Sequence, residues 1–166
     1  MKRKLAIILV VAVILSLLIV VPVNAKKPLR GWIDADFNLG FGDAGTPCPE
    51  ITWVGNIDID GVLFGFAWTP TSPLREAGRS IHYTDIWMIY ESPFAYDGGV
   101  FEECEAEMAV WGYDAGAASP VNAVANGTVE WVNPDGPFDE MLTGRNIHWS
   151  GVSDSPIEFS GWFRIN

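Results

Sequence analysis

The sequence contains little positive charge. Ten of its 166 residues are Lys or Arg, against 21 Asp or Glu, so the formal net charge is −11. No lysine follows Lys27, and residues 26–166 hold seven basic side chains against all 21 acids, which gives 7 − 21 = −14. Such a surface repels a phosphate backbone, which argues against nucleic-acid binding.

Cysteine is almost absent, since the chain has only Cys48 and Cys104. Two thiols alone do not complete a zinc site, so no metal is expected there. In an oxidising compartment an isolated pair is most simply a disulfide. The bond would close a loop of roughly 60 residues and contribute on the order of 4 kcal/mol.

A long apolar run occurs once, at residues 5–21, after the basic residues Lys2, Arg3 and Lys4. Pro22 ends it, and Ala25 closes a small-x-small cleavage pattern. The pattern predicts a secretory signal peptide over residues 1–25, with an uncleaved membrane anchor as the alternative. Residues 26–30 then form a short linker, and residues 31–166 form one domain that is secreted or held at the extracytoplasmic cell surface.

Helical periodicity over ten residues is lacking in residues 26–166. The eight tryptophans instead recur at intervals of about one strand plus one turn. We predict eight strands with one tryptophan each, at residues 31–39, 50–59, 62–69, 80–91, 105–113, 120–132, 140–152 and 157–166. Eight strands with short connections predict an all-β fold, an antiparallel up-and-down barrel, with a two-sheet β-sandwich as the alternative.

Residues 53–68 predict a hairpin, because Asp60-Gly61 lies between alternating apolar residues. A two-residue turn there places Trp53 opposite Trp68, and Gly55 opposite Phe66, on the buried face. We interpret the two tryptophans as a cross-strand pair inside the barrel.

The predicted strand at 120–132 presents small residues on its apolar face, which leaves space inside. Space with a few polar groups is typical of a ligand pocket. Asp85 shares a face with Tyr83 and Trp87, and Arg145 shares one with Trp149. We therefore predict a ligand site lined by Asp85, Arg145, Tyr83, Trp53, Trp68, Phe66 and Trp149.

Asp85 and Arg145 would be costly inside a barrel singly but tolerable as a pair. As a pair they could anchor a ligand hydroxyl or carboxylate, or act as a general acid and base. They could equally be a structural ion pair, or a bulge could turn either residue outward. His82 adjoins this group, while His82 and His148 both fall on outer faces with no metal motif.

Four segments resemble secreted barrels of the allene oxide cyclase and dirigent type. They are Trp53-Val-Gly-Asn-Ile57 before Asp60-Gly61, His82-Tyr-Thr-Asp-Ile-Trp87, Gly127-Thr-Val-Glu-Trp131 and Gly161-Trp-Phe-Arg-Ile165. The resemblance implies an eight-stranded barrel that holds a lipophilic or phenolic molecule. It assigns no residue of this chain a catalytic role.

These observations give three hypotheses of function. The first is a non-enzymatic barrel that binds a small apolar or phenolic ligand in its interior, without a cofactor. The second is a cyclase or isomerase that shapes a lipophilic substrate and uses Asp85 or Arg145. The third is an interaction or structural protein of the cell surface, which an exposed aromatic patch would favour.

Overall fold

The computed structural model describes residues 27–41, 51–94, 96–97, 100–101, 107–119, 121–155 and 158–166. The predicted signal peptide and both cysteines lie outside these ranges. Within them, no helix has the length and apolarity that a membrane crossing requires. The regular elements are β1 (Leu29–Phe41), β2 (Ile51–Ile59), β3 (Val62–Pro70), β4 (Arg75–Ala77), β5 (Ser80–Tyr90), β6 (Tyr96–Asp97), β7 (Val100–Phe101), β8 (Met108–Ala118), β9 (Asn122–Val132), the 3₁₀ helix η1 (Glu140–Leu142), β10 (Asn146–Ser155) and β11 (Glu158–Ile165).

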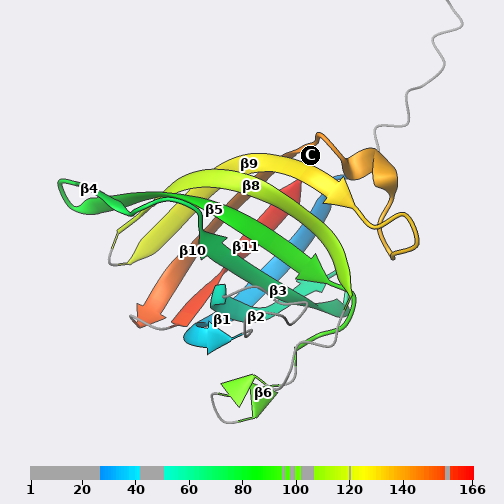
Figure 1. The fold of residues 1–166 in the computed structure, drawn as a ribbon, viewed down its shortest axis with the longest axis horizontal. Helices are drawn as coiled ribbons and strands as arrows, with labels where there is room; N and C mark the ends of the chain where they lie inside the picture. Colours follow the sequence, from blue (N-terminus) through cyan, green and yellow to red (C-terminus); the bar gives the residue numbers. More distant parts are fainter. Residues whose placement is uncertain are drawn as a thin grey trace, which may run out of the picture.

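Eight long strands form a closed antiparallel barrel. Each strand pairs with the next long strand along the chain, from β1 through β2, β3, β5, β8, β9 and β10 to β11, and β11 pairs back onto β1. β4 extends the edge of β5 and reaches beyond the rim, whereas η1 lies at the opposite end, near the C-terminus (Figure 1). Closure confirms the predicted up-and-down barrel and excludes the sandwich.

The hairpin of β2 and β3 has the predicted register. Trp53 pairs with Trp68 and Gly55 with Phe66. Asp60 and Gly61 both have positive φ, at 52° and 85°, as a type I′ turn requires. The two indoles stack with ring centroids 5.2 Å apart and an interplanar angle of 4°.

Aromatic rings fill the middle of the barrel. Phe163 contacts Phe66 at 5.7 Å and Trp87 at 5.2 Å between ring centroids. Phe159 lies against Trp68 at 5.2 Å. Four tryptophans lie inside (Trp53, Trp68, Trp87 and Trp149), and four lie on the outer wall (Trp32, Trp111, Trp131 and Trp162).

One end of the barrel is closed by the connection between β9 and β10. Phe138 and Leu142 from this connection pack against the interior core. The ring of Phe138 lies 5.0 Å from that of Phe64 on β3. This connection therefore forms an apolar plug. The plug joins the β1–β2 and β3–β5 sides of this end to the later strands.

A second apolar cluster lies on the outer wall, over β2, β3 and β5. It contains Val54, Ala67, Met88, Tyr90 and Phe94. The chain after β5 folds back over these strands, where the backbone of Phe94 exchanges two hydrogen bonds with the Asn56 side chain. This cover explains why both faces of β5 are apolar, a pattern that the sequence alone left ambiguous.

Three strand predictions were wrong in detail. β8 runs to Ala118, five residues beyond the predicted strand end at residue 113. β10 begins at Asn146, because η1 occupies the start of the strand predicted at 140–152. Alternation along the strand predicted at 120–132 places Trp131 on the same inner face as Val129. Trp131 instead points outward, because a bulge shifts the register of β9 beside Gly112.

Gly55 provides a test of how closely β1 and β2 approach. A Cβ on Gly55 would lie 2.6 Å from the Ala35 Cβ and would overlap the β1 backbone, whereas one on Gly61 would meet nothing within 4 Å. We expect Gly55→Ala to lower the free energy of unfolding by about 3 kcal/mol, through overpacking. Gly61→Ala should cost only about 1–2 kcal/mol, through its positive φ.

Chemical denaturation followed by tryptophan fluorescence measures both effects. The Gly61→Ala variant is the control for losing a glycine without losing space. An equal cost for the two substitutions would contradict the close approach of β1 to β2.

Candidate functional site

At the barrel end opposite the plug, several described inward-facing residues are less buried than those in the middle of the strands. Most inward-facing positions in the middle are buried, whereas several near this end are half-buried. Ile81 is exposed, and the half-buried inward positions are Trp53, Tyr83, Gly116, Ala118, Ala123 and Gly151. Most of these side chains are small or absent, as the sequence predicted for residues 120–132. We call this part of the interior the open end.

Two carboxyl groups lie side by side just below the open end. Asp85 on β5 pairs directly with Asp114 on β8, so both side chains point to the same face of the sheet. Asp85 is 1% exposed and Asp114 is 5% exposed. They are the two buried polar or charged residues in the described part of the chain. We call them the carboxyl pair.

The carboxyl pair is incompletely hydrogen-bonded. The indole Nε1 of Trp149, on β10, donates to Asp114 Oδ2 at 2.6 Å. Asp85 Oδ1 and Asp114 Oδ1 are buried without a partner, as is Nε1 of Trp87. Buried polar atoms are nearly always paired, so this concentration of unpaired atoms marks an unusual place in the barrel.

Burial and mutual repulsion change the acidity of these groups. Burial, and then the charge of Asp114, raise the pKa of Asp85 to about 8. Burial raises the pKa of Asp114 to about 7, while the hydrogen bond from Trp149 opposes that rise. Burial, followed by the charges of Asp85 and Asp114, also raises the pKa of the Tyr83 phenol. Near neutral pH the pair therefore retains at least part of its protons.

Six of the seven predicted site residues come together in the interior. Tyr83 stacks on Trp149, with centroids 6.1 Å apart and an interplanar angle of 21°. The chain of ring contacts continues from Trp149 to Trp68 at 5.6 Å, and from Trp68 to Trp53 and Phe66. Asp85 lies two residues from Tyr83 on the same face of β5.

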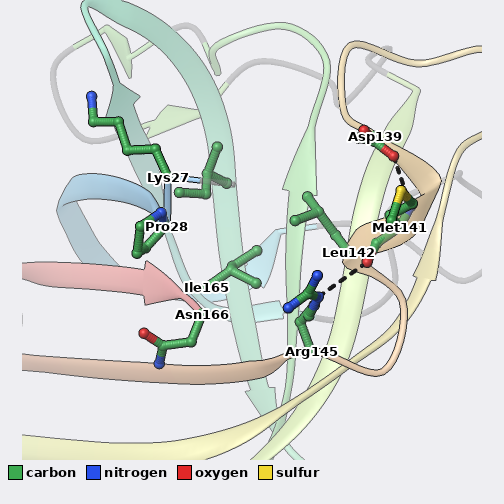
Figure 2. A pocket seen from close by; sticks show the side chains of 9 residues that line it. Lys27, Pro28, Asp139, Met141, Leu142, Arg145, Ile165 and Asn166 are labelled. Atoms are coloured by element: carbon green, nitrogen blue, oxygen red, sulfur yellow. Dashed lines mark hydrogen bonds between the residues drawn. The ribbon is translucent and has the colours of Figure 1, made fainter. Parts of the chain in front are cut away.

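Arg145 is the exception, and its predicted pairing with Asp85 is wrong. It is exposed, precedes β10, and donates from Nε to the Met141 carbonyl at 3.3 Å. It lines a hollow of about 30 Å³ at the plugged end, together with Leu142, Ile165 and others (Figure 2). Gly144, with φ of 77°, turns the chain away before β10 begins, so inward alternation does not extend back to residue 145.

Asp114 is a site residue that the sequence did not predict, and it takes the place beside Asp85 that was expected for Arg145. Its signal was the alternation of Val110, Gly112, Asp114 and Gly116, which continues past residue 113. The sequence predicts that this strand ends at residue 113, because Asp114, Gly116 and the Ser119-Pro120 pair are typical of turns. In this barrel Asp114 and Gly116 instead belong to the inner wall, where Gly116 pairs with Tyr83.

The remaining predicted site features lie apart from the carboxyl pair. His82 and His148 are exposed on the outer wall, and His148 Nδ1 lies 2.9 Å from Asn126 Oδ1. Among the described residues, no group of three or more His, Cys, Asp or Glu is arranged to hold a metal ion. Cys48 and Cys104 lie outside the described residues, so their disulfide stays a prediction.

Comparison with protein-family models, curated proteins and solved structures finds no match for this chain. The resemblance to allene oxide cyclase-type barrels therefore stays a prediction, and the site is interpreted from its geometry. Chemically, the carboxyl pair can accept hydrogen bonds, share a proton, transfer a proton, or bind a cation.

The raised pKa values predict how stability depends on pH. Between about pH 4, the ordinary carboxyl pKa, and pH 8, the folded state holds protons that the unfolded chain has lost. The contribution of the pair to stability is therefore full below about pH 4 and is lost as the pH rises to 8. Asp85→Asn removes one of these groups. As the pH rises through this range, the free energy of unfolding of the variant should therefore fall less than that of the wild type, by on the order of a few kcal/mol.

Urea denaturation at several pH values between 5 and 8.5 measures this slope. Asp34→Asn, at an exposed position on β1, removes the same charge from the outer wall and should keep the wild-type slope. An equal slope in Asp85→Asn and wild type would contradict the raised pKa of Asp85.

Proposed function

We propose that this protein binds a small apolar or phenolic molecule in the open end of its barrel. The observation that carries the proposal is the carboxyl pair, with an unpartnered oxygen on each carboxyl, below a ring-lined end of the interior. A group that serves packing alone would be apolar here, since burying an unpaired polar atom costs about 1–3 kcal/mol.

The residues of the open end supply both parts of such a site. Tyr83 and Trp53 present half-buried rings, while Ala118, Ala123 and Gly151 occupy little of the space between the strands. An apolar or aromatic body would contact these rings, and a polar group at its tip would reach toward Asp85 and Asp114. Ligand sites commonly combine an apolar lining with a few convergent polar groups.

An enzymatic role is the alternative use of the same residues. Asp85 and Asp114 face each other, and their raised pKa values suit proton transfer near neutral pH. A cyclase or isomerase would use one carboxyl as the acid and the other as the base. The binding role requires fewer steps and is the one that we place first.

The proposed location is outside the cytoplasm. The support comes from residues 1–25, whose basic start, apolar run and small-residue end follow the pattern of an export signal. The strongly acidic composition of residues 26–166 agrees with a domain that stays dissolved and does not adhere to nucleic acid.

The outer wall favours a second candidate, an interaction surface. Trp32 on β1 and Trp162 on β11 form a cross-strand pair, with ring centroids 4.8 Å apart in an edge-to-face arrangement. They are 40% and 60% exposed. Large exposed rings are typical of protein interfaces, and here they would bind a second copy or another surface protein.

Binding to the open end can be tested with 4-ethylphenol and isothermal titration calorimetry. We expect saturable binding to the wild type, with a Kd in the range from about 1 µM to 1 mM that small ligands of this size reach. Ala123→Phe places a ring in the open end and should weaken binding by about tenfold or more.

The matched control is Val152→Phe, which adds a ring at an exposed position of β10 beside the open end. It should bind as the wild type does. The proposal would be contradicted if the wild type gave no binding signal in the titration, or if Ala123→Phe and Val152→Phe bound 4-ethylphenol with the same affinity.

The outer pair gives a separate prediction. If Trp32 and Trp162 form an interface between copies, sedimentation equilibrium of the wild type should show dimers that Trp162→Ser removes. Tyr113→Ser, which removes an exposed ring from β8, is the control and should leave the association unchanged. A monomeric wild type at high protein concentration would count against self-association.

A further inference from the structure

Among the described residues, the carboxyl pair has no positively charged partner. All six lysine and arginine side chains that the structure describes are exposed, as are both histidines: Lys27, Arg30, Arg75, Arg79, Arg145 and Arg164, with His82 and His148. The ion pair between Lys27 Nζ and Asp60 Oδ1, 3.5 Å apart, lies on the surface. In the described interior, two acids therefore face each other without a base.

Such a pair stays neutral by holding protons or by binding a cation. A buried carboxylate is costly unless it is paired, and two adjacent carboxylates repel each other as well. Asp114 accepts a hydrogen bond from one neutral donor, the indole of Trp149, and Asp85 Oδ1 is buried without a hydrogen-bond partner. A cation between the two carboxyls would reach both unpartnered Oδ1 atoms and remove the repulsion.

The groups around the carboxyl pair indicate what kind of cation fits. Tyr83 and Trp149 stack beside it, and Trp149 also donates to Asp114. Ring faces attract organic ammonium groups, whereas Mg²⁺ and Ca²⁺ are held by six or more oxygen ligands. Carboxylates with N–H donors in between form strong charge-assisted hydrogen bonds.

Tyr83 is the residue of the open end that lies next to the carboxyl pair on β5. It precedes Asp85 by two residues on the same face, and its hydroxyl donates to the Val124 carbonyl at 3.4 Å, which is a long hydrogen bond. Gly116 leaves the space for this hydroxyl, since a Cβ there would lie 2.6 Å from it. A ligand that enters from the open end therefore passes the Tyr83 ring before it reaches the acids.

We propose that the open end selects molecules that carry an ammonium group on an apolar or aromatic body, with the ammonium held between Asp85 and Asp114. The inference rests on the proposed function and specifies its ligand class. The body lies against Tyr83 and Trp149, and the ammonium donates to the unpartnered oxygens of the carboxyl pair. Binding requires the pair to give up protons, so it releases protons to the buffer.

The test compares two probes that differ in one polar group, 2-phenylethylamine and 2-phenylethanol. Calorimetric titration at pH 7 should show that the wild type binds the amine at least about tenfold more tightly than the alcohol. The observed enthalpy should change with the ionisation enthalpy of the buffer, as proton release demands.

Asp85→Asn and Asp114→Asn, which are nearly isosteric, should each abolish the preference for the amine. Asp34→Asn on the outer wall should keep it and serves as the control for a general loss of negative charge. Thermal melts establish that each variant is folded. The proton release of the wild type tests the same inference without any substitution.

Among the described residues, few titrating groups lie around the proposed ligand position. β5 contributes Tyr83 and Asp85, and β8 contributes Asp114. The facing residues of β9 and β10 are Gly127 and Trp149, which do not titrate. The amine stays protonated between pH 6 and 9, so its affinity should rise over this range as the pair ionises.

Three results would overturn the inference, and they are distinguishable. Equal binding of amine and alcohol means that the carboxyl pair only shares protons, while the proposed function stands. Binding of Ca²⁺ that Asp85→Asn removes, without a preference for the amine, means an inorganic cation site. Failure of both phenyl probes and of 4-ethylphenol removes the proposed function together with the inference.

Discussion

The pairing of β3 with β5 is the contact on which the other features of this structure depend. The remaining neighbours, from β3 back through β1 and β11 to β5, already form one continuous sheet, and this pairing closes it. Once the sheet is closed, every inward side chain of eight strands points into one enclosed space. That space has to be filled with apolar groups, or with polar groups that find partners inside it, because water reaches it only through the ends.

The interior meets this requirement unevenly along its length. Toward the plugged end, the rings of Phe64, Phe66 and Phe163 are buried, and the chain between β9 and β10 adds Phe138 as a cover. Toward the open end, the inner wall of β8 and β9 consists mainly of glycine and alanine. The same division places the carboxyl pair near the boundary, where the large rings give way to small side chains. The carboxyl pair is therefore buried, but it lies only two positions along β5 and β8 from the half-buried Tyr83 and Gly116.

The sequence predicted the parts of the fold that depend on local chemistry. Asp60-Gly61 predicted which residues of the hairpin pair with each other, because a tight turn with positive φ permits only one register of the two strands. The inward position of Asp85 followed from simple alternation along an uninterrupted strand. Alternation failed where the strand was not regular: a bulge turned Trp131 outward, and η1 with Gly144 displaced Arg145 from the inner wall. Such irregularities depend on contacts between distant segments, which a single strand's pattern does not contain.

The missed Asp114 shows how a site can be half visible in a sequence. An inward acid was expected to have an inward base, since that arrangement minimises the cost of burial. The barrel instead sets a second acid opposite the first, and all described bases are on the outside. The many acids on the outer wall do not explain this arrangement. An exposed carboxylate stays hydrated, so it costs the folded state almost nothing. Two buried carboxyls with unpartnered oxygens cost the folded state several kcal/mol at neutral pH, by the size of their pKa changes. Apolar residues at positions 85 and 114 would avoid this cost, and the proposed binding of a ligand group between the two carboxyls would offset it.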